Sequence, residues 1–130
     1  MGRVVLDASI VISIATPDDA KQLDAIAALD SRRADELLLP ASAYTETLLW
    51  PMKAGKEAVG RLDRFLAEMS IEIAPISAAV ARRAAELRSR RRAIALGDAL
   101  VIAAGDVLKA DEILTSDRSW RRVNHRVTVI

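Results

Sequence analysis

Residues 4–15, Val-Val-Leu-Asp-Ala-Ser-Ile-Val-Ile-Ser-Ile-Ala, contain the change from strand to helix on which the fold depends. Val4-Val5-Leu6 is a short apolar run rich in β-branched residues, which is typical of a buried strand. The run ends at Asp7, and residues 8–15 are again mostly apolar and predict a first helix. A buried strand that leads through an acid directly into a helix indicates the start of an α/β unit.

The rest of the chain alternates short apolar runs with helical patterns. Pro51 is expected to end or kink its helix, and Ser77 is expected to cap the helix that follows it. This alternation predicts an α/β domain with a mostly parallel sheet. No linker, repeat or low-complexity segment interrupts the chain, so we interpret residues 1–130 as one domain. Further strands are expected at residues 36–39, 71–73, 112–115 and 127–130, and helices at 19–32, 41–52, 55–69, 77–92 and 97–108.

Composition limits the classes of function. Hydrophobic residues make up 52% of the 130 residues, which is enough for a core and excludes general disorder. Aromatic residues are only 3%, so a nucleic-acid platform of stacked rings is not expected. There is no cysteine and one histidine, His125, which excludes disulfides, thiolate metal sites and His-rich metal sites. Any bound metal would therefore have oxygen ligands.

Charge and the N-terminus add two expectations. The net charge of +1 predicts no strong steering toward anions, although 15 of the 19 basic residues are arginine, which binds phosphate and carboxylate through two bonds at once. The apolar stretch after Arg3 is interrupted by Asp7 and is not followed by a cleavage site for a signal peptidase. No run approaches the roughly 18 apolar residues of a membrane helix. We therefore expect a cytoplasmic protein with no membrane partner.

Four acidic residues are expected to meet at one edge of the sheet. In a parallel sheet the strand ends and the helix starts lie at the same edge, where ligands bind. Asp7 and Asp117 follow the ends of two strands, Asp98 starts the last long helix, and Glu46 lies about one turn into the helix after the second strand. Taken singly, Asp98 fits a helix N-cap, Asp117 a turn and Glu46 a solvated helix position. Asp7 differs, because burial of its charge would be costly.

Together the four acids predict metal chemistry. Two carboxylates about 4 Å apart repel each other by about 4 kcal/mol at an effective dielectric constant near 20. Three or four of them therefore need a cation or take up protons. Oxygen ligands without histidine or cysteine suit Mg²⁺ or Mn²⁺. One or two such ions commonly activate a water molecule and stabilise the leaving oxygen in phosphate chemistry. Whether one ion or two would act is not decided by the residues.

Four ordered motifs carry a resemblance to a known family. The chain resembles PIN-domain ribonucleases and, within them, the VapC toxins of type II toxin–antitoxin modules. Motif order, spacing and total length all agree with that family, except that its members often carry proline where this chain has Gly97. The motifs are Val5-Leu6-Asp7-Ala8-Ser9, Tyr44-Thr45-Glu46, Gly97-Asp98-Ala99-Leu100-Val101-Ile102-Ala103-Ala104 and Leu114-Thr115-Ser116-Asp117.

The resemblance implies a three-layer α/β/α sandwich around a mostly parallel sheet of four or five strands. It implies an endoribonuclease that depends on one or two Mg²⁺ or Mn²⁺ ions and leaves a 5′-phosphate and a 3′-hydroxyl. Ser9 and Thr115 match hydroxyl positions that help to hold a carboxylate or a metal-bound water. Glu46 would bind metal or orient the water. The catalytic positions carried over are Asp7, Glu46, Asp98 and Asp117, with Asp7, Asp98 and Asp117 as metal ligands.

The resemblance also implies partners. Such toxins form homodimers and are neutralised by a VapB-type antitoxin, whose C-terminal segment lies across the active site. Two groups of arginines are candidates for contacts with RNA phosphates or with an acidic antitoxin segment. The first group lies at the end of a basic helix, which could instead be a plain solvated surface. The second group follows Asp117 directly. These arginines are Arg90, Arg91, Arg92, Arg118, Arg121 and Arg122.

Other functions fit the residues less well. A haloacid-dehalogenase-type phosphotransferase needs a second aspartate two residues after Asp7, where this chain has Ser9. A receiver domain needs a pair of acids at the first strand, where this chain has Asp7 alone, and a lysine of the receiver type near the end, which is also lacking. A non-catalytic PIN-like module that binds RNA or a protein remains the alternative. The loss of two or more acids would favour that alternative, whereas all four are present.

Overall fold

The computed structural model describes residues 1–130 and is built around a five-stranded sheet with the order β3-β2-β1-β4-β5. Every neighbouring pair of strands is parallel; in the register, Val5 lies opposite Leu38 on one side and Ile113 on the other. The predicted α/β class with a mostly parallel sheet is therefore confirmed. The strands are β1 (Arg3–Leu6), β2 (Glu36–Pro40), β3 (Ile71–Ala74), β4 (Glu112–Thr115) and β5 (Val127–Val129).

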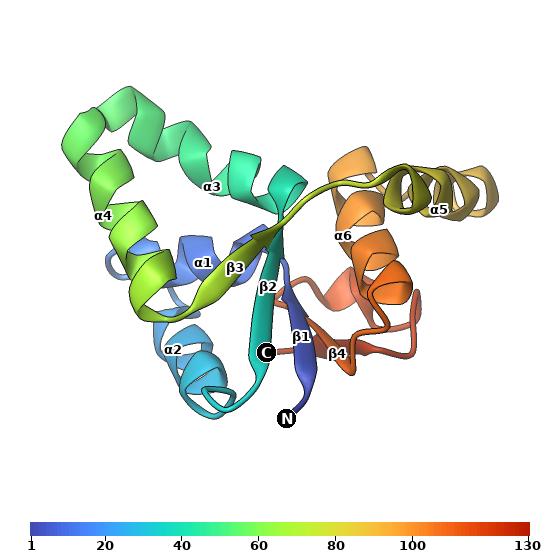
Figure 1. Cartoon of the computed structure of the whole chain (residues 1–130), viewed down its shortest axis with the longest axis horizontal. Coiled ribbons are helices and arrows are strands. Elements are labelled where there is room, and N and C mark those ends of the chain that lie inside the picture. The colour runs from blue at the N-terminus through green and yellow to red at the C-terminus, as the bar shows by residue number, and fades with distance from the viewer.

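Helices cover both faces of the sheet and complete the predicted α/β/α sandwich (Figure 1). In the view of Figure 1, α1, α2 and α4 lie to one side of the sheet and α5 and α6 to the other, while α3 leads from the end of β2 to α4. No helix is both long enough and apolar enough to cross a lipid bilayer. The helices are α1 (Ala8–Ala15), α2 (Gln22–Asp30), α3 (Ala41–Ala54), α4 (Lys56–Glu68), α5 (Ala78–Arg90) and α6 (Leu96–Val107), with a 3₁₀ turn, η1, at Arg118–Trp120.

The core is aliphatic, as the composition predicts, and α6 is its central helix. A single cluster of 29 buried hydrophobic residues includes the buried face of α6, from Ala99 to Ala104, and the inner residues of β1, β2 and β4. Gly105 of α6 packs directly on β4, because a Cβ at this position would clash with Cδ1 of Ile113. This close approach holds α6 tightly against β4.

Several helix boundaries differ from the predicted ones for local reasons. α3 continues through Pro51 to Ala54, since proline removes only one backbone donor, and it ends at Gly55, whose φ of 123° a residue with a side chain rarely adopts. α2 begins only at Gln22, because residues 16–21 form turns. α5 ends at Arg90, so the prediction of one helix through residue 92 was wrong. The predicted cap at Ser77 is confirmed by the hydrogen bond from Val80 N to Ser77 Oγ (3.2 Å).

Candidate active site

Asp7 is a buried carboxylate at the point where β1 passes into α1. Its Oδ2 accepts hydrogen bonds from Thr115 Oγ1 (2.7 Å) and Ser9 Oγ (2.8 Å). Only 8% of the residue is exposed, and this burial raises the pKa of Asp7 although the two hydroxyls act in the opposite direction. Because both hydroxyls donate to the same oxygen, neither of them occupies the second oxygen, Oδ1.

Thr115 connects the ends of the two adjacent strands β1 and β4. It is completely buried, and its Oγ1 donates to Asp7 while accepting a hydrogen bond from Asp117 N (3.1 Å). Ser9 makes a second link of the same kind, because its Oγ accepts from Ser116 N (3.1 Å). The loop that carries Asp117 is therefore held against the Asp7 carboxylate by two hydroxyls.

Asp117 is exposed and has two roles. Its Oδ1 accepts hydrogen bonds from Ser119 N (2.9 Å) and Ser119 Oγ (2.7 Å), so it caps the short η1 turn, as the turn interpretation predicts. Its negative charge also contributes to the raised pKa values of Asp7 and Asp98. The cap thus fixes a carboxylate that still faces the other acids.

Asp98 is the third residue of α6, and its interpretation as the N-cap was wrong. The helix is capped at Ala95 and has no side-chain cap, so the Asp98 carboxylate is not used for that purpose. Its pKa is raised by burial first and then by the charges of Asp7 and Asp117, while a hydrogen bond from Trp120 acts in the opposite direction. Asp98 therefore faces other acids across the edge of the sheet.

Glu46, in the second turn of α3, faces the same edge. Its pKa is raised by partial burial and by the charges of Asp7 and Asp98. The Glu46 carboxylate lies against the first turn of α6, because a Cβ at Gly97 would be only 2.7 Å from Glu46 Oε1. Sequence reasoning treated Gly97 only as the loss of a proline. The available signal was a glycine beside an acid at the start of a buried helix.

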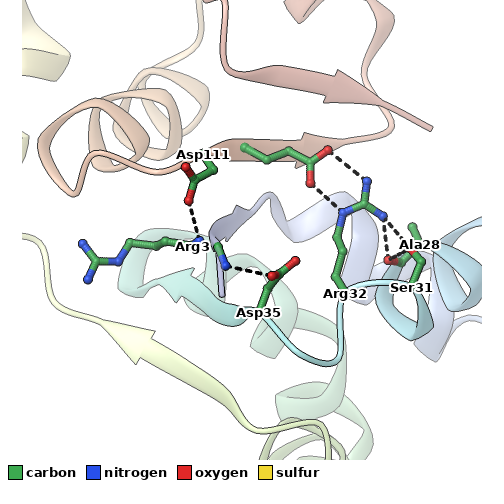
Figure 2. Close-up of polar contacts among 8 residues, drawn as sticks. Arg3, Ala28, Ser31, Arg32, Asp35 and Asp111 are labelled. Carbon is green, nitrogen blue, oxygen red and sulfur yellow. Dashed lines mark hydrogen bonds and ion pairs between the residues drawn. The ribbon is translucent and has the colours of Figure 1, made fainter.

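The four acids have no cationic partner, unlike Glu36 and Glu112 at the other edge of the sheet. Asp7, Glu46, Asp98 and Asp117 form no ion pair with lysine, arginine or histidine. At the amino-terminal ends of the strands, Asp35 and Asp111 accept hydrogen bonds from the backbone N–H groups of Gly2 and Arg3, as Figure 2 shows. Arg32 there binds Glu112 through two bonds (2.6 and 2.9 Å). At the carboxyl-terminal edge, by contrast, no cationic side chain offsets the charge of the four acids.

The donor set at this edge suits a hard divalent cation. It consists only of carboxylate and hydroxyl oxygens, and three of its four acids have raised pKa values that a cation would reverse. No three of these side chains lie close enough together to form a ready-made ligand group. Mg²⁺ tolerates such a site, because it keeps several waters and binds one or two carboxylates together with substrate phosphates.

Comparison with known proteins decides the family. The PIN domain family matches residues 4–126 of the chain. The chain belongs to the PIN domain family. No curated protein matches the sequence.

Solved structures share the fold of this PIN domain at low sequence identity. A toxin–antitoxin complex from Klebsiella pneumoniae is 18% identical with a TM-score of 0.73, over 97% of this chain and 96% of that one. VapBC2 from Rickettsia felis, bound to a DNA fragment from its promoter, is 18% identical with a TM-score of 0.75, over 96% of both chains. VapC20 from Mycobacterium tuberculosis, a toxin that cleaves the sarcin–ricin loop, is 17% identical with a TM-score of 0.70, over 85% and 86%.

The arginines that the sequence singled out have no carboxylate partners, and two of them, Arg91 and Arg92, line a hollow together with Asp98. All six are exposed and none is in an ion pair, whereas Arg3, Arg32 and Arg126 at the opposite edge are paired. Arg91 Nη2 lies 3.5 Å from the backbone oxygen of Arg122, which links the loop after α5 to the loop after η1. The exposed, unpaired arginines are Arg90, Arg91, Arg92, Arg118, Arg121 and Arg122.

Two hollows flank the carboxylates of the PIN domain. A groove of about 540 Å³ between α1, α3 and α4 is mainly apolar and includes Glu46 in its lining, with Trp50 and Leu49 largely exposed along it. A second hollow of about 400 Å³ lies between the loop after α5 and η1 and includes Asp98. The acids therefore lie between an apolar groove and a hollow that contains arginines. Neither hollow was predicted, because each is lined by segments far apart in the sequence.

Proposed function

We propose that this PIN domain is a VapC-like toxin, an endoribonuclease that depends on Mg²⁺ or Mn²⁺ and is neutralised by a VapB-type antitoxin. The observation that carries the proposal is the convergence of four uncompensated carboxylates beside exposed, unpaired arginines. Acids without counter-charges attract a divalent cation, and unpaired arginines attract phosphates. Cleavage of a phosphodiester backbone uses both a divalent cation and cationic contacts to the phosphates. A nucleic-acid backbone is therefore the substrate class that fits this edge.

In the proposed mechanism, Asp7, Asp98 and Asp117 would hold one or two ions. When bound, such ions supply a water of lowered pKa and stabilise negative charge on the phosphate. The Ser9 and Thr115 hydroxyls hold Asp7 through Oδ2, which orients its carboxylate. Their bonds to the backbone of residues 116 and 117 keep the Asp117 loop beside it.

Glu46 is suited to accept a proton from the attacking water. It is open to solvent, and it lies near enough to Asp7 and Asp98 for their charges to act on it, which places its carboxylate beside the position where the ions would be held. The water oxygen forms a bond to phosphorus, its proton passes to Glu46, and the bond from phosphorus to the 3′-oxygen breaks. The 3′-oxygen then takes a proton from solvent, which leaves a 5′-phosphate and a 3′-hydroxyl.

An antitoxin segment fits the apolar groove between α1, α3 and α4. Trp50 is 71% exposed and Leu49 is 61% exposed there, an apolar surface that a soluble chain seldom leaves open. The groove reaches Glu46, so a segment bound in it would end at the acids. Structural neighbours that are themselves toxin–antitoxin complexes support this choice of partner. A homodimer and a cytoplasmic location belong to the same proposal.

The second candidate is a PIN-like module that binds RNA or protein without cutting. The observation that favours it is the absence of a ready-made group of three ligands. In both candidate functions the RNA binds at the same edge of the sheet. Only the endoribonuclease would also cut the RNA in a reaction that depends on metal.

Cleavage of a mixed RNA pool separates the two candidates. The wild-type protein should cut with Mg²⁺ or Mn²⁺ and stop when EDTA is added, and end mapping should find 5′-phosphates. Asp98→Asn should reduce the rate by at least about a hundredfold, as is usual when one stabilising group is removed from such a site. Asp24→Asn, an exposed acid on α2, is the matched control and should cut like the wild type. A wild-type protein that binds the pool but leaves it intact would favour the binding module.

A further inference from the structure

We propose that the hollow beside Asp98 binds one nucleotide unit of the RNA next to the bond that is cut, with Arg91 and Arg92 on its phosphate. The inference rests on the proposed function for its placement in a reaction, and it concerns a subsite rather than the metal site. The hollow measures about 400 Å³, inside the range of about 300–1,000 Å³ typical of small-molecule sites. It is lined by Arg91, Arg92, Ala93, Ile94, Asp98, Ile102, Ser119, Trp120 and Val123.

The lining divides into an apolar wall and a cationic wall. Ile94, Val123 and the largely buried Trp120 contribute apolar surface suited to a flat base and the carbon face of a ribose. Arg91 and Arg92 form the other wall, and their planar guanidinium groups can bind a phosphate through paired hydrogen bonds. A ligand with one anionic group and one flat, weakly polar ring matches this division.

The two arginines are free to take a ligand. Neither is within ion-pair distance of a carboxylate, and both are exposed at the rim of the hollow. Arg91 is oriented by its contact with the Arg122 carbonyl (3.5 Å), which joins the two loops that form the walls. Arg90 is equally exposed but does not line the hollow, because α5 ends at this residue and the chain turns there. The consecutive arginines therefore do not share one role.

The position of the hollow favours a nucleotide over an acidic peptide. Asp98 belongs to both the hollow and the set of four acids, so a ligand in the hollow lies beside the site of cleavage. An acidic segment would place several carboxylates near Asp98, whereas a nucleotide brings one phosphate, which the arginines can draw to the far wall. The apolar wall would have no ligand group to contact if only an inorganic anion bound.

Trp120 provides a direct probe of the hollow. The chain has two tryptophans, and Trp50 lies in the other groove, so Trp50→Phe leaves a single reporter in the hollow wall. Metal-free Trp50→Phe protein would be titrated with a nucleoside 5′-monophosphate, with inorganic phosphate, and with a short peptide of aspartate and glutamate. We expect a saturable change in Trp120 fluorescence with the nucleotide, at lower concentration than with phosphate or peptide.

Charge-matched variants separate the hollow from general electrostatics. Arg91→Gln with Arg92→Gln should weaken nucleotide binding about tenfold or more, because charge-assisted hydrogen bonds are lost. Arg64→Gln with Arg82→Gln removes the same charge from two exposed, unpaired arginines outside the hollow and should change binding by less than about threefold. Equal weakening by both pairs would overturn the proposal. So would tighter binding of the peptide, equal binding of phosphate, or no response to the nucleotide.

The same variants show which proposal has failed, if one does. In one outcome, the protein binds the nucleotide through Arg91 and Arg92 but cuts no RNA with either metal. That result would support the nucleotide subsite and contradict the proposed endoribonuclease activity. Alternatively, the wild type cuts RNA and the two double variants do not differ from each other in nucleotide binding or in cleavage. That result would support the endoribonuclease activity and contradict the nucleotide subsite.

Discussion

Gly97 and Glu46 are in such close contact that a Cβ at residue 97 would lie 2.7 Å from Glu46 Oε1, so a side chain there would displace the Glu46 carboxylate. The contact joins the first turn of α6 to the second turn of α3, the two helices that carry the third and the second of the four motifs. The glycine therefore lets the Glu46 carboxylate lie beside Asp98, whose charge contributes to its raised pKa.

Gly97→Ala should separate stability from function. Alanine favours a helix over glycine by about 0.5–1 kcal/mol, and the Glu46 side chain can move aside, so the free energy of unfolding should stay unchanged or rise. Mn²⁺ affinity and RNA cleavage should fall, because Glu46 is displaced from the acids. Urea unfolding, calorimetric Mn²⁺ titration and a cleavage assay measure the three quantities.

Two further variants test the reason for that effect. Gly60→Ala, on α4, is the control, since the nearest atom to its Cβ would be Arg64 Nη1 at 3.7 Å, and it should leave metal affinity unchanged. Glu46→Asp shortens the side chain and should cost less metal affinity in the Gly97→Ala protein than in the wild type. Additive effects of the two changes would show that the contact does not position Glu46.

Asp98→Asn should stabilise the metal-free protein at neutral pH. The pKa of Asp98 is raised in the folded state, so the wild-type protein loses stability as pH rises from the ordinary value of 3.8 through the folded value. The variant has no such loss. Near pH 7 we expect the free energy of unfolding of the variant to exceed that of the wild type by up to about 1 kcal/mol, a small amount because solvent screens a half-exposed group. Near pH 3 we expect no difference.

Urea unfolding of both proteins with EDTA across this pH range measures the difference. Asp24→Asn is the control, because this exposed acid lies on α2 outside the four acids, and it should show no advantage that depends on pH. An Asp98→Asn protein that is less stable than the wild type at pH 7 would mean that the carboxylate is stabilised by a partner rather than repelled by the other acids.

Thr115→Val should destabilise the protein and weaken the site. The change keeps the shape of the side chain but removes the donor to Asp7 Oδ2 and the acceptor for Asp117 N. Loss of a buried partner costs about 1–3 kcal/mol, and RNA cleavage should fall as Asp7 and Asp117 lose their common support. Thr45→Val removes an exposed hydroxyl on α3 and should stay within about 0.5 kcal/mol of the wild type. Equal losses of stability and cleavage in the two variants would show that Thr115 does not support Asp7 and Asp117.

The features that could be predicted from sequence are those set by neighbouring residues or by topology. The β1 strand and the position of Asp7 follow from one apolar run that stops at an acid. The meeting of the four acids follows from the parallel sheet, because strand ends and helix starts share an edge whatever the side chains do. Arg91 and Arg92 were placed in the helix because arginine is a good helix former, and nothing in their own identity indicates that α5 ends at Arg90.

The features that were missed depend on contacts between distant segments. Gly97 and Glu46 are separated by 51 positions, and the fit between them is visible only when α3 and α6 are placed. The hollow beside Asp98 needs the loop after α5 to meet η1, which no local pattern shows.

Calorimetric titration with Mn²⁺ tests the central claim most directly, because it needs no knowledge of the RNA. The wild-type protein and the double variant Asp7→Asn with Asp98→Asn would be compared at neutral pH. We predict binding in the micromolar to millimolar range by the wild type and none by the variant, since the variant keeps the shape of both side chains and loses their charge. Equal binding by the two proteins, or binding by neither, would contradict a metal site built from these carboxylates.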